Sequence, residues 1–201
     1  SYSGETRRSI EAQLEEGIRV LELDLHDDEY DALGDYRIGH LWPGDDVSDE
    51  GGNPDTDRLA PWLELIRAWS AAHEDHAPIT LVLDLKDSLA DNQSAGQGNL
   101  GALNARLEAA LGDHLAAAGE IEAPWPTVDA LRGRILTVLS GDRGSRLAYL
   151  RDHGVNPAVA ANAHGDVIEV HDSGRGGLWF WSGRLGPEGS VDWLHHGRYA
   201  G

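Results

Sequence analysis

The sequence contains no cysteine and no methionine among its 201 residues. The lack of cysteine excludes disulfide bonds, thiolate chemistry and cysteine-based zinc sites, and it leaves the compartment open. Long apolar runs are also missing. The longest, Ile79 to Leu83, is far shorter than the roughly 20 residues that a membrane-spanning helix needs. No signal-peptide pattern opens the chain, and because it does not begin with Met, we expect residue 1 to be a processing or cloning boundary.

Basic residues are scarce: 16 lysines and arginines stand against 35 acidic residues, for a formal net charge of −19. This balance excludes nucleic acid as a partner, because phosphate backbones bind basic surfaces. It also disfavours simple electrostatic docking to anionic lipid. An acidic protein that handles a phosphate group needs a cation between the two, so the charge favours a metal. The alternative is that the acidic surface serves solubility.

Hydrophobic residues make up 40% of the chain, as in a globular protein, and their spacing alternates between helical and extended periods. We expect helices at 5–17, 62–69 and 100–115, and strands at 18–25, 37–42, 79–85 and 134–139. Gly17 is expected to end the first helix, and Thr127 to cap a further short helix. Strands that alternate with helices predict an α/β fold with a parallel sheet.

After about residue 150 the pattern changes to short β runs separated by glycine-rich turns. The runs are 157–162, 166–173, 178–185 and 191–196, and they predict a small four-stranded antiparallel β-meander. We therefore expect two domains, 1–150 and 151–201. A closed eight-stranded barrel takes about 250 residues, and the first domain offers only about half of the strands. Either it is part of a barrel, or the C-terminal strands complete the sheet in an unusual way.

Two carboxylates, Glu22 and Asp24, lie two residues apart on the strand predicted at 18–25. Side chains alternate along a strand, so both lie on one face, away from the leucines between them. Inward carboxylates on a buried strand are costly unless a cation or hydrogen bonds compensate. Oxygen ligands at this spacing suit Ca²⁺ or Mg²⁺. The alternative is a solvated acidic face on an edge strand.

His40 lies near the end of the next predicted strand, where parallel sheets place reactive groups. Asp84 and Lys86 repeat the same-face pattern at the end of the strand predicted at 79–85. A lysine beside carboxylates can contact a phosphate, or it can form an ordinary salt bridge. The run 26–29, His-Asp-Asp-Glu, could bind a cation loosely, although acidic loops usually serve only solvation.

The order of these segments resembles the catalytic X region of the phosphatidylinositol-specific phospholipases C. The resemblance lies in Gly-Ile-Arg-Val-Leu-Glu-Leu-Asp (17–24), Gly-His (39–40), Pro-Ile-Thr-Leu-Val-Leu-Asp-Leu-Lys (78–86) and Leu-Arg-Gly-Arg-Ile-Leu (131–136). It covers about residues 1–142 and implies a PLC-like (β/α) TIM barrel, partial or distorted. In that family the inositol 2-hydroxyl attacks the phosphorus, and diacylglycerol is released with one histidine as base and a second as acid.

The resemblance also implies roles for individual residues. Glu22 and Asp24 would be ligands of calcium (or magnesium), and His40 the second histidine. Lys86 and Asp84 would belong to the same catalytic site, with Lys86 near the phosphate, where metal-dependent members often carry an acidic ligand. The implied substrate is a phospholipid or another phosphodiester at a membrane surface, and the implied location is secreted or extracytoplasmic. The oligomeric state is not indicated.

Three functions stay open at this point. The family carries a His-Asn pair shortly before a Ser or Thr and a Tyr, and residues 1–3, Ser-Tyr-Ser, resemble the end of that motif. The His and Asn of this motif, the first catalytic histidine and one metal ligand, are then either missing or lie before Ser1. A binding protein that has lost this histidine is therefore one alternative to an active phospholipase. The other is a phosphodiesterase with another head-group preference, such as a sphingomyelinase D. A glycerophosphodiesterase would carry His-Arg-Gly and Glu-Asn-Thr segments, which the sequence lacks.

Overall fold

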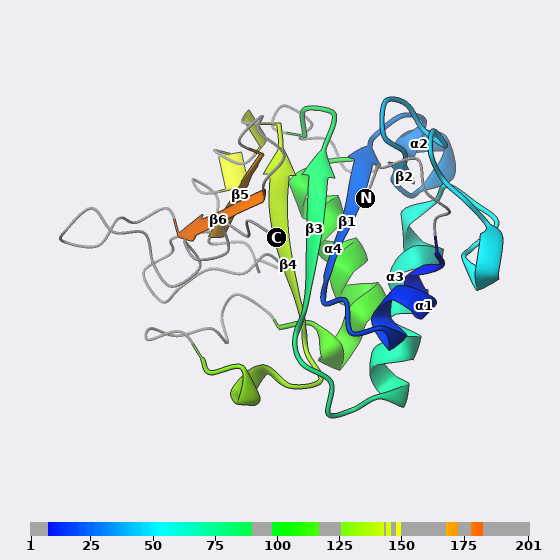
Figure 1. The fold of residues 1–201 in the computed structure, drawn as a ribbon. Helices are drawn as coiled ribbons and strands as arrows, with labels where there is room; N and C mark the ends of the chain where they lie inside the picture. Colours follow the sequence, from blue (N-terminus) through cyan, green and yellow to red (C-terminus); the bar gives the residue numbers. More distant parts are fainter. Residues whose placement is uncertain are drawn as a thin grey trace.

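The computed structural model describes residues 8–89, 98–116, 126–142, 144–145, 148–149, 168–172 and 178–182, the last two ranges by their backbone. The described strands form one six-stranded sheet in the order β2-β1-β3-β4-β5-β6 (Figure 1). Their bounds are β1 Val20–His26, β2 Arg37–Ile38, β3 Ile79–Leu85, β4 Ile135–Gly141, β5 Ile168–Asp172 and β6 Leu178–Ser182. The helices are α1 Ile10–Glu15, α2 Tyr30–Leu33, α3 Leu59–Ala72 and α4 Leu100–Leu111, with short 3₁₀ turns η1 Glu50–Gly52, η2 Gly112–His114 and η4 Asp129–Leu131.

The centre of the sheet is parallel, as the alternation of strands and helices predicts. β3 pairs in parallel with β1 and with β4, and Leu83 lies in register with Leu23 on one side and Leu139 on the other. All three leucines belong to the buried core. β3 begins at the residue after Pro78 and keeps its predicted bounds, because its central residues Leu81, Val82 and Leu83 are aliphatic and buried on both faces of the sheet.

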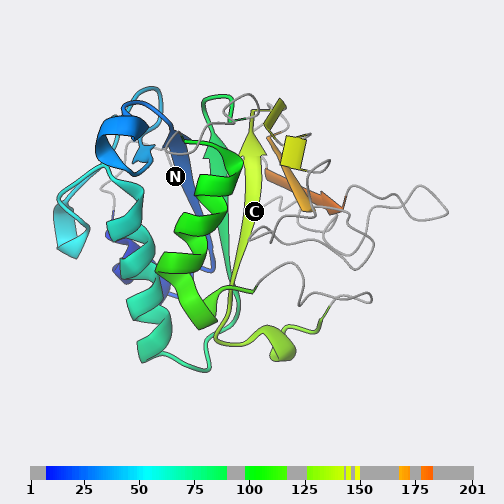
Figure 2. The ribbon, with the colours of Figure 1, turned by 180° about the vertical axis from the view of Figure 1, so that it is seen from behind.

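Helices α3 and α4 lie against one face of the sheet, and α1 packs beside α3 (Figures 1 and 2). Leu63 and Ile66 of α3 and Leu107 of α4 are fully buried between the helices and the strands. Burial of each such side chain stabilises the fold by about 1.5–3 kcal/mol. The layer of helices therefore covers one face of the sheet, and the opposite face carries Asp84 beside the buried Val82 and Val138.

Helix α1 is shorter than the predicted helix 5–17. Ser9 precedes it as N-cap, with its Oγ accepting a hydrogen bond from the Ala12 amide at 3.2 Å. The helix ends at Glu15, and Gly17 then takes a φ of +92°, a left-handed conformation that favours glycine. The expectation that Gly17 stops the helix is confirmed, while residues 5–7 of the prediction lie outside the described residues.

Two predicted elements extend too far. The strand at 37–42 ends at Ile38, because the chain turns back and the Gly44 amide donates to the Ile38 carbonyl at 2.8 Å. β2 is moreover antiparallel to β1, so His40 does not lie at the end of a parallel strand. The helix at 100–115 ends at Leu111, where Gly112 leaves helical geometry with φ 52° and ψ −133°.

The C-terminal strands continue the sheet. β5 pairs in parallel with β4 through Leu139 and Glu169, and β6 pairs with β5 antiparallel. They match two of the four predicted short runs, and the runs 157–162 and 191–196 lie outside the described residues. The domain boundary near residue 150 stays a prediction. The described elements thus form an α/β fold whose central strands are parallel. Among the described residues, no helix has the length and apolarity to cross a membrane.

Candidate functional site

Carboxylates from two neighbouring strands meet on the face of the sheet that lies opposite helices α3 and α4. Asp24 of β1 and Asp84 of β3 are in register, and Glu22 precedes Asp24 on the same face. One carboxylate oxygen from each residue lies within 4.8 Å of the other two. Asp24 is buried, Asp84 is half-buried and Glu22 is exposed. Glu22, Asp24 and Asp84 are called the carboxylate cluster below.

The negative charges of the carboxylate cluster repel one another, and the effect is seen in the pKa of Glu22. Although its side chain is partly solvent-exposed, burial raises the pKa of the Glu22 carboxyl, and the charges of Asp24 and Asp84 raise it further. The charge of Lys86 acts in the opposite direction and does not cancel these effects. Like charges brought together without compensation produce such a shift in pKa. Part of the negative charge of the cluster is therefore uncompensated.

Lys86 follows directly after β3 and lies between two members of the cluster. Its Nζ donates to Asp84 Oδ2 at 2.6 Å and forms an ion pair with Asp24 Oδ1 at 3.2 Å. Burial lowers the pKa of Lys86, but its hydrogen bonds and charge interactions with Asp84 and Asp24 outweigh that effect and raise the pKa. Lys86 therefore stays charged and compensates part of the cluster.

His40 reaches the cluster from the turn that follows β2. Its Nδ1 lies 3.2 Å from Asp24 Oδ2, and its side chain is 36% exposed. An ionised carboxylate can only accept, so Nδ1 carries the hydrogen and the lone pair of a neutral imidazole is on Nε2. A side chain at Gly39 would place its Cβ 2.1 Å from the Trp42 carbonyl oxygen. Glycine is thus required for the tight turn that brings His40 to Asp24.

The charges of these groups fit a divalent cation. Three ionised carboxylates and one ammonium group leave two negative charges uncompensated. Carboxylate oxygens are the ligands that calcium and magnesium prefer. All five residues predicted for the site, Glu22, Asp24, His40, Asp84 and Lys86, are thus within one connected set of contacts. The roles assigned to them stay predictions.

A second group of three residues lies at the same end of the sheet, and sequence reasoning found only its members in the run 26–29, not Asp87. His26 ends β1, and ligand atoms of His26, Asp28 and Asp87 lie within 4.8 Å of one another. The sequence signal was only the acidic run after His26. Asp87 lies 60 residues further along the chain than Asp27, and the Asp27 amide donates to the Asp87 carboxylate at 3.1 Å. Asp87 is close to His26 and Asp28 only because β1 pairs with β3.

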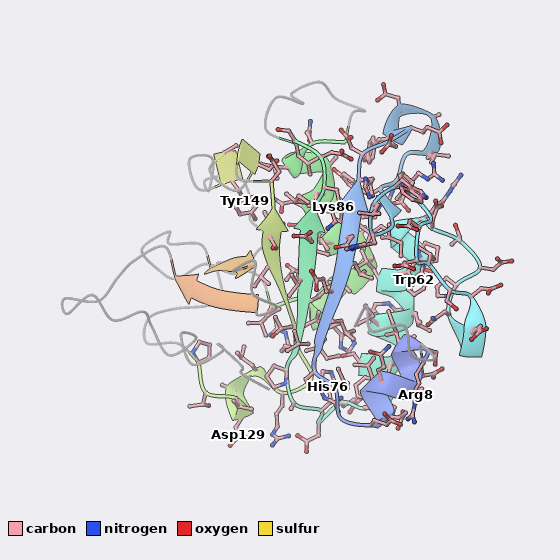
Figure 3. The ribbon with its side chains drawn as sticks, turned by 45° about the horizontal axis from the view of Figure 1, so that its top comes forward. Arg8, Trp62, His76, Lys86, Asp129 and Tyr149 are labelled. Carbon is pink, nitrogen blue, oxygen red and sulfur yellow. The ribbon has the colours of Figure 1, made fainter. Side chains whose placement is uncertain are left out.

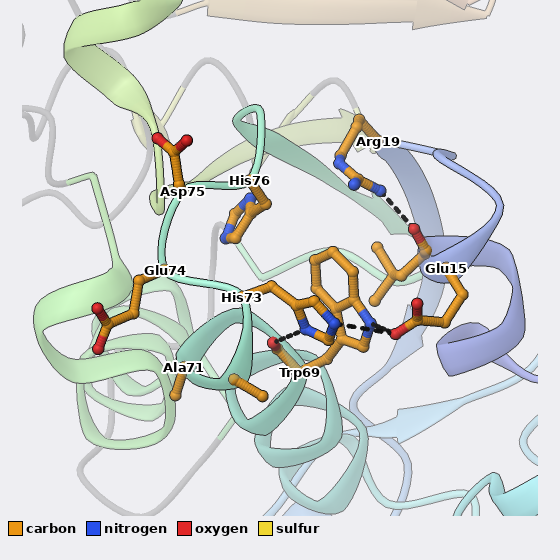
Figure 4. A pocket seen from close by; sticks show the side chains of 10 residues that line it. Glu15, Arg19, Trp69, Ala71, His73, Glu74, Asp75 and His76 are labelled. Atoms are coloured by element: carbon orange, nitrogen blue, oxygen red, sulfur yellow. Dashed lines mark hydrogen bonds and ion pairs between the residues drawn. The ribbon is translucent and has the colours of Figure 1, made fainter.

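A cavity of about 700 Å³ lies at the other end of the sheet, far from the carboxylate cluster (Figures 3 and 4). Trp69 lines it, stacked on His73 with 4.1 Å between ring centroids, and its indole nitrogen donates to Glu15 at 2.7 Å. The Arg19 guanidinium lies 4.8 Å from the Trp69 ring. Trp69 and His73 both contact Glu15 here, whereas Arg19 Nε is buried without a hydrogen-bond partner among the described residues. Figure 3 shows Lys86 and His76 at opposite ends of the strands.

His76, next to this cavity, takes part in a closed hydrogen-bond network. Its Nδ1 lies 2.6 Å from the Ala77 carbonyl, so Nδ1 carries the hydrogen and Nε2 accepts from Ser70 Oγ at 2.6 Å. His114 Nδ1 in turn donates to Ser70 Oγ at 2.9 Å. Burial lowers the pKa of His76, and the nearby charges of Arg19 and His114 lower it further. The network links α3 and η2 to the loops before β3 and β4.

The site thus lies on an α/β fold, with helices on one face of a parallel sheet and the acidic cluster on the other. No protein-family model matches the sequence, and no curated protein does. The likeness is to solved structures. One is a calcium-dependent phosphoinositol-specific phospholipase C from Pseudomonas sp., a Gram-negative bacterium, in the apo form, with a TM-score of 0.61 and 21% identity over 76% of this chain and 59% of that chain.

Two further structures support the same fold. The myoinositol complex of the Pseudomonas enzyme gives a TM-score of 0.61 and 22% identity over 76% of this chain and 58% of that chain. A Ca²⁺-dependent phosphatidylinositol-specific phospholipase C from Streptomyces antibioticus gives 0.52 and 29% over 64% of this chain and 46% of that chain. The chain therefore spans about half of the length of these enzymes. The likeness confirms the predicted PLC-like fold.

Proposed function

We propose that this chain provides the catalytic face of a phosphodiesterase that cleaves a phospholipid such as phosphatidylinositol. The observation that carries the proposal is the pairing of His40 with Asp24 at 3.2 Å beside the carboxylate cluster. A histidine oriented by a buried carboxylate is a typical proton donor or acceptor. The solved structures of phosphoinositol-specific phospholipases C that share the fold support this class of reaction.

Each residue takes a part in the proposed reaction. Asp24 orients the His40 imidazole, and protonated His40 donates a proton to the leaving alkoxide of diacylglycerol. The Lys86 ammonium lies where it can stabilise negative charge on the phosphoryl oxygens. Glu22 and Asp24, with Asp84 beside them, would hold a calcium-class ion, which lowers the pKa of the attacking hydroxyl and neutralises the phosphate. No described residue is proposed as the base.

The second candidate is a binding protein with this fold that no longer cleaves its ligand. The position of Lys86 favours it, because the Lys86 ammonium already pairs with Asp24 and Asp84, two of the three carboxylates. An ammonium in this place competes with a metal ion for the same oxygens. The phospholipid as ligand is common to both candidates, and the location that we propose for both is secreted or extracytoplasmic, acting at a membrane surface.

The direct test is release of the inositol head group from phosphatidylinositol micelles, first with calcium and then with a chelator. Turnover that needs calcium is expected for the wild-type chain. His40→Asn is expected to lower the rate at least about 100-fold, the usual contribution of one acid–base group. His73→Asn is the matched control, since His73 is 40% exposed and pairs with Glu15 at the other end of the sheet.

The other outcomes separate the candidates. A folded wild-type chain that binds the micelles without releasing head group supports the binding protein. Equal rates for His40→Asn and wild type would remove His40 from the mechanism. Parallel assays with sphingomyelin and with glycerophosphodiesters measure the head-group preference, because nothing in the described residues favours inositol over another head group.

A further inference from the structure

A second group of metal-ligand atoms lies at the end of β1, and it differs in chemistry from the carboxylate cluster. His26 Nδ1 is 3.4 Å from Asp87 Oδ2 and 3.8 Å from Asp28 Oδ2. The His26 side chain is only 6% exposed, whereas those of Asp87 and Asp28 are 36% and 54% exposed. One buried imidazole and two carboxylates thus converge, with the carboxylates on the solvent side.

The hydrogen bonding of His26 fixes its tautomer. Its Nε2 lies 2.9 Å from the Gly39 carbonyl oxygen, and because a carbonyl can only accept, Nε2 carries the hydrogen. In a neutral imidazole the lone pair is then on Nδ1, which points at Asp87 and Asp28. Nδ1 makes no hydrogen bond to any residue that the structure describes. The Nδ1 atom of a side chain that is only 6% exposed thus lies 3.4 and 3.8 Å from two carboxylate oxygens, an arrangement that a cation between them would compensate.

The spacing agrees with a shared ion better than with direct hydrogen bonds. An imidazolium that donates to a carboxylate has an N···O distance of about 2.7–2.9 Å, shorter than either distance at His26. Around a tetrahedral ion with bonds of about 2.0–2.1 Å, two ligand atoms lie about 3.3–3.4 Å apart. The 3.4 Å distance from Nδ1 to Asp87 Oδ2 has this value, and the 3.8 Å distance to Asp28 needs only a small movement of an exposed side chain.

Neighbouring contacts hold the ligands as a metal site requires. A metal-binding histidine typically donates its other ring nitrogen to a carbonyl or carboxylate, and His26 does so at Gly39. The Asp27 amide donates to Asp87 Oδ2 at 3.1 Å and orients that carboxylate. Imidazole together with two carboxylates suits zinc, cobalt and other transition metals, whereas calcium and magnesium prefer oxygen ligands.

We propose that His26, Asp28 and Asp87 form a binding site for a transition-metal ion of the zinc class, separate from the carboxylate cluster. The ion would join the end of β1 to the segment before α2 and to the residue that follows Lys86. Through the His26–Gly39 hydrogen bond it would also stabilise the turn that carries His40. The proposal does not depend on the proposed phosphodiesterase activity, since it concerns binding of the metal itself.

The test is titration of the metal-free chain with Co²⁺ in the presence of excess Ca²⁺, which saturates an oxygen-only site. We expect one equivalent of Co²⁺ to bind with the intense visible absorption of tetrahedral cobalt, and Zn²⁺ to displace it. Asp28→Asn and Asp87→Asn are expected to weaken binding by about 10-fold or more. His26→Gln is expected to abolish the absorption band.

Two variants outside the proposed metal site serve as controls. Glu22→Gln removes a member of the carboxylate cluster and is expected to leave the cobalt spectrum unchanged, and His73→Asn tests the histidine near Glu15. If His26→Gln does not fold, the cobalt spectrum of Asp28→Asn still tests the site, because Asp28 is exposed and its substitution disturbs no core packing. A wild-type chain without the cobalt band, a band that survives in both Asp28→Asn and Asp87→Asn, or a band lost in Glu22→Gln or His73→Asn would overturn the proposal.

Discussion

The two ends of the parallel sheet both bring histidines together with oxygen partners, but they differ in charge. At the amino end, Ser70 Oγ contacts His76 at 2.6 Å and His114 at 2.9 Å, and these groups can all be neutral. At the carboxyl end, the carboxylate cluster meets one ammonium group and one imidazole. Two histidines that share a serine hydroxyl and one histidine beside three acids therefore differ in what they indicate.

The difference shows how a structural network can be told from a binding site: in the network the polar groups complete one another's hydrogen bonds and charges, and in the binding site they do not. Buried groups that complete one another's hydrogen bonds stabilise the fold and have no need of a ligand. The raised pKa of Glu22 marks the opposite situation, in which burial and the charges of Asp24 and Asp84 are not compensated. A ligand that brings positive charge lowers the free energy of such a cluster. The predictions below test this contrast.

The largest effect is expected from Glu22→Gln on calcium affinity. The substitution removes one of the uncompensated charges but preserves the size of the side chain. Outer-shell partners of metals typically contribute about 10–100-fold in affinity, so loss of a direct ligand should weaken calcium binding at least about 100-fold. Isothermal titration calorimetry measures this. A binding curve identical to that of wild type would exclude Glu22 as a ligand.

Ser70→Ala should act on stability alone. The alanine leaves His76 Nε2 without its donor at 2.6 Å, in a position where His76 is buried. An unsatisfied buried polar group costs about 1–3 kcal/mol of unfolding free energy, which denaturant titration can measure. Calcium affinity should not change, because the network lies at the other end of the strands. Weaker calcium binding in folded Ser70→Ala would break the contrast between the two ends.

The sequence predicts the two ends unequally well. Alternation along a strand places Glu22 and Asp24 on one face, and the aliphatic run after Pro78 predicts β3 with its observed bounds. These are local properties of the chain. The proximity of Asp84 to Asp24 is not local, because it depends on a register between strands 60 residues apart. Only the order of segments in the resemblance indicated that they share a site.

Two other features lay beyond sequence reasoning for physical reasons. The position of His40 depends on a turn closed by hydrogen bonds from Gly44 to Ile38 and from His40 to Asp45, which a strand pattern over 37–42 conceals. The network around Ser70 draws on α3, η2 and the loop before β4, and a buried serine in a helix gives no sequence signal of its partners. Polar contacts between distant segments follow from tertiary packing, so they become visible only in the folded chain.

Lys86→Gln should raise calcium affinity, the reverse of the effect at Glu22. Lys86 occupies oxygens of Asp24 and Asp84, and its charge repels an incoming cation. We expect binding to tighten by about 10-fold, a conservative fraction of the Coulomb repulsion between charges a few ångströms apart. Lys86→Arg retains the charge and is the control. The head-group release rate should fall in Lys86→Gln if Lys86 contacts the phosphate, and weaker calcium binding would show that Lys86 does not compete.

The smallest effect is the pH dependence of stability, and the two ends should contribute with opposite signs. His76 has a lowered pKa, caused mainly by burial, so the unfolded chain binds its proton first as the pH falls below about 6.5. The stability contribution of His76 is therefore complete above that pH and is lost during acidification. Glu22 has a raised pKa, so the folded chain binds its proton first, and acidification towards the ordinary value of 4.5 adds stability.

Unfolding free energies of wild type, His76→Gln and Glu22→Gln, measured by urea titration between pH 7.5 and 4.5 without metal, separate the two contributions. The loss of stability on acidification should become smaller in His76→Gln, since that chain has no imidazole to protonate at the amino end. It should become larger in Glu22→Gln, which lacks the compensating gain at the carboxyl end. If both variants shift the pH profile in the same direction, the two ends do not differ in charge compensation as their contacts indicate.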